Sequence, residues 1–255
     1  MGLLRDAAAV AKCVSGQQGL SLVYATYAKE LRRIDVRLVR VAEGDADALD
    51  ILRDALRRTL EVLLAAARPL TLVELAALSG GSRLGKRQLL NALTLVFPAR
   101  EAGAGVQPLH KRVFDFLWRG EEGKEGGDGF AAVDEVAGHM TLAKACTALV
   151  REDGGESVAR AYAEVHEVTH MARCAVAAAD KGGHADAEAV SKAWLAAREA
   201  ADDAEGIRMA ADKIRDFGLY RVAIPWGERA AALRPDDADV QMSLGYAMGS
   251  QGRYT

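Results

Sequence analysis

The feature that most constrains this 255-residue chain is a pattern that recurs at an offset of 34 residues near its end. Gly218 and Tyr220 align with Gly252 and Tyr254 at that offset. The helix-forming stretch before each pair aligns as well, with Ala210 and Ala211 matched to Leu244 and Gly245. A regular offset of this size indicates a repeated supersecondary unit that stacks on its neighbour.

Three residues between the two copies fit a helix-turn-helix unit. Ala223 and Ala230 are small enough to let two helices approach closely, and Pro235 would end the second helix. A period of 34 residues with glycine at the turn is typical of tetratricopeptide repeats. We therefore expect one full repeat at 204–237 and a truncated one at 238–255, which together form the segment 204–255. Their helices are expected at 204–217, 221–234 and 238–251.

The truncated unit would lack its second helix and leave an apolar face uncovered. Repeats of this kind bury their faces only against neighbours, and about three are needed for stability. This predicts self-association through the uncapped C-terminal repeat, and it suggests a fragment of a longer protein. A degenerate unit at 170–203, indicated by Val176-Ala177, Ala189 and Ala196, stays open because its turn residues fit poorly.

Composition favours a mainly α-helical, cytoplasmic protein. Half of the residues are hydrophobic but only 5% are aromatic, so alanine and leucine, which favour helices, supply much of the apolar content. The net charge of −3 offers no basic footprint for nucleic acid and no polybasic membrane patch. The three cysteines form no CxxC pair, as expected of buried thiols in a reducing compartment.

The residues that end and cap helices in the segment 69–120 predict a winged-helix-like domain. Pro69 ends an amphipathic helix at 48–68, and Thr71 with Glu74 predicts a capping box at the next helix. A glycine turn and a second helix at 86–96 follow. Apolar pieces at 95–97 and 106–109 flank Pro98 and two glycines, which predicts one small β-hairpin.

The remaining segments complete the expected organisation. Residues 1–68 form a helical segment, residues 121–129 a Gly-rich loop, and residues 130–203 a helical linker region.

Several stretches of the first half resemble the winged-helix region of NACHT-type signal-transduction NTPases. They are ALRRTLEVLLAAARPLTLVELAALSG, LLNALTLVF and VQPLHKRVFDFLWRG, followed by the helical stretch FAAVDEVAGHMTLAKACTALV. The resemblance implies a relay domain of a switch NTPase, whose nucleotide-binding core would lie before Met1. It also implies that His110 contacts ADP, but only together with that absent core. Arg112 and Val113 depart from the family's motif at this point.

Two motifs suggest chemistry that their context does not support. In HEVTH, His166 and His170 could bind zinc with Glu167 as general base, which makes a zinc metallopeptidase the alternative function. GGSRLGKR resembles a phosphate loop up to Lys86. The next position of a phosphate loop must be Ser or Thr, but this chain has Arg87 there. The preferred interpretation is a non-catalytic protein-binding module without cofactors, metal, nucleic acid or membrane partners.

Overall fold

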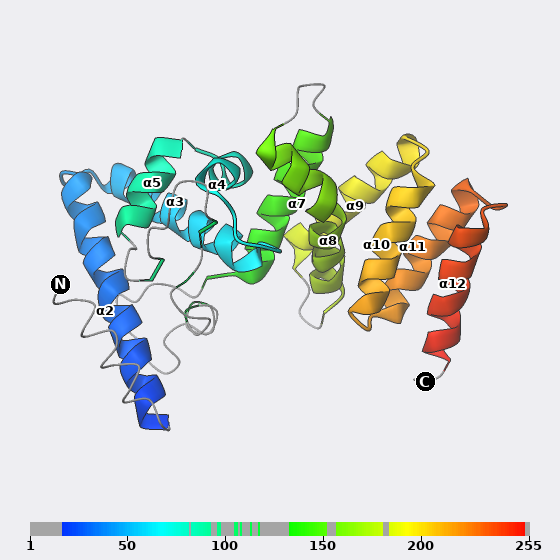
Figure 1. The fold of residues 1–255 in the computed structure, drawn as a ribbon, viewed down its shortest axis with the longest axis horizontal. Coiled ribbons are helices and arrows are strands. Elements are labelled where there is room, and N and C mark those ends of the chain that lie inside the picture. Colours follow the sequence, from blue (N-terminus) through cyan, green and yellow to red (C-terminus); the bar gives the residue numbers. More distant parts are fainter. Residues whose placement is uncertain are drawn as a thin grey trace.

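The computed structural model describes residues 17–81, 83–92, 96–97, 105–106, 108, 113, 117, 133–151, 157–180 and 184–252. This part of the chain is mainly helical, as the composition predicts (Figure 1). Its helices are α2 (Gln17–Val41), α3 (Ala46–Ala65), α4 (Leu72–Ser79), α5 (Arg83–Ala92), α7 (Glu135–Arg151), α8 (Val158–Ala179), α9 (Ala185–Ala200), α10 (Ala204–Asp216), α11 (Tyr220–Leu233) and α12 (Ala238–Gln251).

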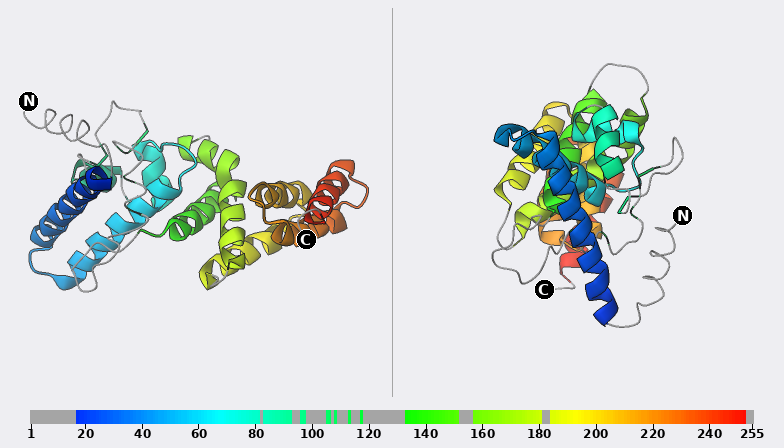
Figure 2. Two further views of the ribbon diagram at one scale, coloured as in Figure 1. Left: turned by 90° about the horizontal axis from the view of Figure 1, so that it is seen from below. Right: turned by 90° about the vertical axis from the view of Figure 1, so that its left-hand side faces the viewer.

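The helices follow one another along an elongated molecule. Helices α2 to α5 occupy one end, α7 and α8 the middle, and α9 to α12 the other end, with α2 and α12 far apart (Figures 1 and 2). Two hydrophobic clusters match this division. One joins α2–α5 to α7 and the first turns of α8, and the other runs from α7 and α8 to α12. The second half is thus a helical repeat-like stack.

Local signals set the helix ends in the first half. Asp45 caps α3 by accepting hydrogen bonds from the amides of Asp47 and Ala48. The capping box of Thr71 and Glu74 at α4 is confirmed, with both reciprocal hydrogen bonds present. Helix α3 ends at Ala65, before the expected limit at residue 68. Ala66 at its C-cap is extended, so the helix stops ahead of Pro69.

The segment expected to form a winged helix contains two helices and one β-bridge among its described residues. Helix α5 runs over 83–92 rather than the expected 86–96. Leu70 pairs antiparallel with Val106, whose amide donates to the Leu70 carbonyl over 2.7 Å. The segment after α5 therefore returns to the residues that precede α4. Most of the expected hairpin at 95–109 lies outside the described residues.

Helices α10, α11 and α12 match the spans expected from the 34-residue offset to within a residue or two. The expected spans were 204–217, 221–234 and 238–251. Gly218 makes the turn between α10 and α11 with φ of +80°, a conformation that favours glycine. The degenerate unit at 170–203, which the sequence left open, has no helix boundary at its start, because α8 runs on through residue 170.

A membrane-spanning segment would need a long apolar helix. Among the described residues, no helix combines the length and hydropathy required to cross a bilayer.

Candidate functional site

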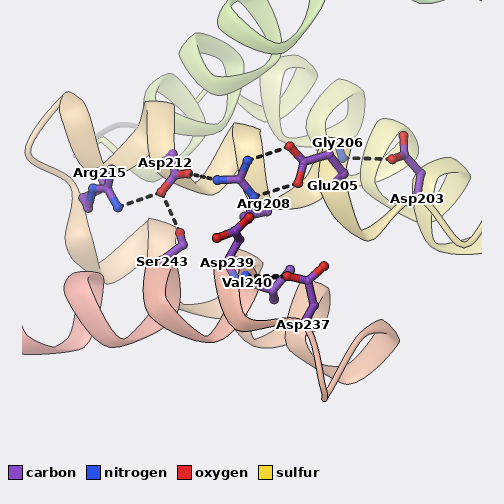
Figure 3. A network of polar contacts seen from close by, with 10 residues as sticks. All are labelled: Asp203, Glu205, Gly206, Arg208, Asp212, Arg215, Asp237, Asp239, Val240 and Ser243. Atoms are coloured by element: carbon purple, nitrogen blue, oxygen red, sulfur yellow. Dashed lines mark hydrogen bonds and ion pairs between the residues drawn. The ribbon is translucent and has the colours of Figure 1, made fainter.

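Helices α10 and α12 lie side by side and share a polar surface (Figure 3). Both begin at an aspartate cap, and the two caps are related by the 34-residue offset. Asp203 accepts from the Gly206 amide over 2.9 Å, and Asp237 accepts from the amides of Asp239 and Val240 over 2.9 and 3.2 Å. The two helices therefore begin at positions that are equivalent under the 34-residue offset.

Arg208 organises the charges of this surface. Its guanidinium donates two hydrogen bonds to Glu205, over 2.7 and 2.6 Å, and one to Asp212 over 2.7 Å. The hydrogen bonds to Glu205 are the main reason why the pKa of Arg208 is raised. Bidentate pairing of this kind fixes the plane of the guanidinium. The surface therefore presents its charges in a set geometry.

Asp212 connects α10 to α12. Its Oδ1 accepts from the Ser243 hydroxyl of α12 over 2.6 Å and pairs with Arg215 at 2.6 Å. Ser243 is buried, while the Asp212 side chain is 21% exposed. The carboxylate that accepts from the Ser243 hydroxyl is also paired with Arg208 and Arg215.

The residues expected to pack the repeat fall into buried and exposed groups. Ala211, Ala223 and Ala230 are buried in the cluster shared by α10 and α11. Leu244 is half-buried and lies on Gly227, where an added Cβ would be 3.2 Å from its Cδ1 atom. Tyr220 is half-buried; Gly218, Pro235, Gly245 and Gly252 are exposed.

The two turn glycines differ in conformation. Gly252 has φ of −65° in the right-handed helical region, unlike Gly218 at +80°. Tyr254 and His110 lie outside the described residues.

The outer side of α12 is apolar. Met242, Tyr246 and Met248 are 54%, 62% and 51% exposed, and the helix carries no charged residue after Asp239. Gly245 adds no side chain to this face, and nothing lies within 4 Å of the position its Cβ would take. At the 34-residue offset, Gly245 and Met248 correspond to Ala211 and Ile214 of α10, which are buried, whereas Met242 and Tyr246 correspond to Arg208 and Asp212 of the polar surface.

The HEVTH residues are engaged in the interior of the protein. His170 is completely buried, and its two ring nitrogens pair with His139 at 3.0 Å and with Tyr162 at 2.9 Å. His166 is half-buried, with its ring 4.5 Å from that of Tyr162. Within the described residues, no group of three or more His, Cys, Asp and Glu side chains could hold a metal ion. The geometry therefore favours a packing role for these histidines.

The Glu167 carboxylate is buried and is bound by side chains of neighbouring helices. Its Oε1 accepts from Thr147 of α7 and from the Trp194 indole of α9, each over 2.8 Å. Its Oε2 pairs with Arg198, which also pairs with Asp203 at the start of α10. The carboxylate thus joins α7, α8 and α9, and Arg198 extends the contact to the start of α10. Sequence reasoning missed Trp194 and Arg198, which follow Glu167 by 27 and 31 residues.

Lys86 lies inside the protein and not in a phosphate loop. It is 4% exposed, and its ammonium donates to the Thr59 hydroxyl of α3 over 2.8 Å. Burial, with a smaller effect from Arg58, lowers the pKa of Lys86 to about 8. Lys86 lies within α5, and α5 follows another helix, α4. The lysine of a phosphate loop instead lies in a loop that follows a buried strand.

Comparisons with protein-family models, curated proteins and solved structures found no match. Function is therefore inferred from the geometry of the chain itself. The α10–α12 surface and the apolar side of α12 are among the features that an external partner can reach.

Proposed function

We propose that this chain is a non-catalytic, cytoplasmic protein-binding and regulatory module whose last helices form a tetratricopeptide-type array. The observation that carries the proposal is the equivalence of α10 and α12. They begin at Ala204 and Ala238, an offset of 34 residues, and each is capped by an aspartate at the same relative position. The 34-residue offset of the sequence pattern is thus also the distance along the chain between two equivalent helix starts.

The packing of α10 against α11 also supports this assignment. Ala223 and Ala230 of α11 are completely buried, as are Ala210 and Ile214 of α10. The three alanines let the two helices pack closely, which is how such repeats form a continuous core. Stacked units then present their first helices side by side, here α10 and α12, as a binding surface.

For the first half, we propose a winged-helix-like relay domain of a NACHT-type switch NTPase. Two observations support it: the capped helix α4 followed by α5, and the antiparallel pairing of Leu70 with Val106. In this pairing, a residue that precedes the two helices bonds with a residue that follows them, as the short strands of a winged helix do. In such a protein this half would transmit the nucleotide state to the repeats.

Partner binding by the repeats can be tested with a matched pair of surface variants. Tyr246→Glu places a charge on α12, and Val165→Glu places one on α8 at a similarly exposed site, 69% against 62%. Proteins from the source cells would be captured on each variant and on the wild type, and quantified by mass spectrometry. We expect a partner that binds the wild type and Val165→Glu but not Tyr246→Glu. Partners lost equally from both variants, or none at all, would contradict the proposal.

Nucleotide binding gives an independent check of the non-catalytic assignment. The isolated chain should neither bind nor hydrolyse ATP, because the only phosphate-loop-like stretch has its lysine buried against Thr59. Isothermal titration calorimetry with ATP and Mg²⁺ would detect binding. Saturable binding that disappears in Lys86→Met would show that the assignment is wrong.

A further inference from the structure

The outward side of α2 carries a stripe of cations. Its members follow one another along the helix at intervals that place them on one side, and all are exposed: Lys29, Arg32, Arg33, Arg37 and Arg40. The net charge of the whole chain is −3, so this local excess of positive charge cannot be read from the composition. Helix α2 lies at the end of the molecule opposite to α12 (Figures 1 and 2).

The other side of α2 is buried, and this fixes the direction of the stripe. Its core side chains belong to the first hydrophobic cluster and are at most 9% exposed: Tyr27, Leu31, Ile34 and Leu38. An amphipathic helix that binds a membrane inserts its apolar side into the lipid. That side of α2 is already packed in the core, so α2 cannot insert it into a bilayer.

Acidic residues of α2 offset only part of the positive charge. Arg33 pairs with Glu30 at 2.8 Å. Asp35, the other acid of the helix, pairs with Arg53 of α3 at 2.7 Å. The stripe therefore keeps a net positive charge and fits an anionic partner.

Exposed valines lie on α2 among these cations. Val36, Val39 and Val41 are 52%, 44% and 68% exposed. A nucleic-acid backbone would pair with the arginines but would leave the valines without an apolar contact. The stripe therefore fits a surface that combines negative charge with apolar side chains.

The outward side of α12 has this combination. The helix begins with exposed acidic residues, namely Asp236 and Asp237 just before it and Asp239 in its first turn. The exposed side chains of Met242 and Tyr246 follow, and they are apolar or aromatic. In charge and in polarity, this side of α12 complements the stripe on α2.

We propose that α2 of one molecule binds the outward side of α12 of a second copy. Within one chain the two helices lie at opposite ends of the molecule, so they cannot meet (Figure 1). A contact between two different surfaces of identical molecules extends into a chain or closes into a ring. The inference rests on the proposed function for the role of α12 as a binding surface, and it names a second copy as one partner of that surface.

An antiparallel arrangement of the two helices matches their side chains. With Asp239 opposite Arg40, Met242 comes opposite Val36. Steps of three and four residues both stay on one side of a helix, so the two matches form together. Tyr246 then lies near Arg33, whose guanidinium can stack on the ring.

Association of the purified full chain provides the first test. In sedimentation velocity at about 20 mM NaCl, the weight-average sedimentation coefficient should rise between about 5 and about 200 μM protein. The rise should be largely lost at about 0.5 M NaCl, because salt screens exposed charges. A wild-type chain that stays monomeric at low salt would overturn the proposal. It would leave the capture of other proteins by α12 unaffected, so the two failures can be told apart.

Charge reversal identifies the two surfaces. Arg37→Glu with Arg40→Glu brings acids to the acidic start of α12, and Asp236→Lys with Asp239→Lys brings cations to α2. Each double variant alone should associate at least about tenfold more weakly than the wild type. An equimolar mixture of the two should associate again, and so should a chain with all four changes. This recovery requires folded variants, so misfolding cannot imitate it.

Lys144→Glu with Lys192→Glu is the matched control. It makes the same change in net charge as the α2 variant, at exposed residues of α7 and α9, and it should associate like the wild type. Association that persists in either reversed variant, or that does not return in their mixture, would show that α2 and α12 do not form the contact.

The α2 variant also separates the second copy from other anionic partners. An RNA of about 20 nucleotides and vesicles with about 30% phosphatidylserine would be titrated into the wild type and into Arg37→Glu, Arg40→Glu. Neither should bind. Binding of RNA or vesicles by a wild type that does not self-associate, and its loss in the variant, would assign α2 to that ligand and overturn the proposal.

Discussion

Gly138 of α7 lies directly against the backbone carbonyl of Glu61 on α3. A Cβ atom on Gly138 would overlap the Glu61 carbonyl oxygen, and it would lie 2.8 Å from the Cβ of Ala65. Backbone atoms cannot rotate away as the end of a side chain can. The contact between the first half of the chain and α7 therefore depends on the absence of a side chain at this one position.

Gly138→Ala should therefore destabilise the protein although alanine favours helices. We expect a loss of about 1–3 kcal/mol in the free energy of unfolding, because α7 must move away from α3. Denaturant unfolding followed by circular dichroism would measure it. Gly245→Ala is the matched control, since it adds the same methyl group to a helix where nothing lies within 4 Å. That substitution should stabilise by about 0.5–1 kcal/mol.

Removing one partner of the Glu167–Arg198 pair should be costly. Arg198→Met leaves a carboxylate that is 5% exposed without its cation, which typically costs about 3–5 kcal/mol. The double variant Glu167→Leu, Arg198→Met should be less destabilised than the sum of the single changes. Glu164→Gln on the exposed side of α8 should change stability by less than about 0.5 kcal/mol. Additive effects in the double variant would contradict a coupled pair.

Lys86 should make stability depend on pH in the alkaline range. Its pKa falls from an ordinary 10.5 in the unfolded chain to about 8 in the folded protein. Below about pH 8 the lysine is charged in both states and the cost of burying the charge is complete; the cost is relieved as the pH rises toward 10.5.

Lys86→Met should therefore stabilise the protein at neutral pH by up to about 3 kcal/mol. Thr59 keeps a partner, because its hydroxyl donates to the Ala55 carbonyl over 2.7 Å. The advantage of the variant should shrink between about pH 8 and 10.5. Comparing variant and wild type at each pH removes the opposite effect of Tyr162, Cys146 and Cys174, whose pKa values are about 12. An advantage that does not change with pH would rule out this role for the lysine.

The close contact between α10 and α11 predicts opposite tolerance at two alanines of one helix. Ala223→Leu should overpack the contact and cost about 1–3 kcal/mol, since Ala223 is completely buried. Ala232→Leu adds the same side chain at an exposed position and should change stability by less than about 0.5 kcal/mol. Equal effects, measured by thermal unfolding, would indicate that the two helices do not pack as described.

Short-range patterns predicted the helices because helix caps and turns depend on neighbouring residues. Thr71 and Glu74 are three positions apart and form their capping box without help from the rest of the fold. The 34-residue offset likewise located α10, α11 and α12, because small residues and a turn glycine recur within each unit. The boundaries of α5 were less well predicted, since the helix runs over 83–92 rather than 86–96.

The sequence alone determined that this is a helical chain with a repeated unit at its end, because helix periodicity and capping are local properties. Only the tertiary structure decided what the polar residues do. HEVTH has the spacing of zinc ligands, yet Glu167 pairs with Arg198 and His170 with His139 and Tyr162. Arg198 follows Glu167 by 31 residues, and His170 follows His139 by 31 residues, each on another helix. Neither proximity across helices nor exclusion of water can be read from residue spacing.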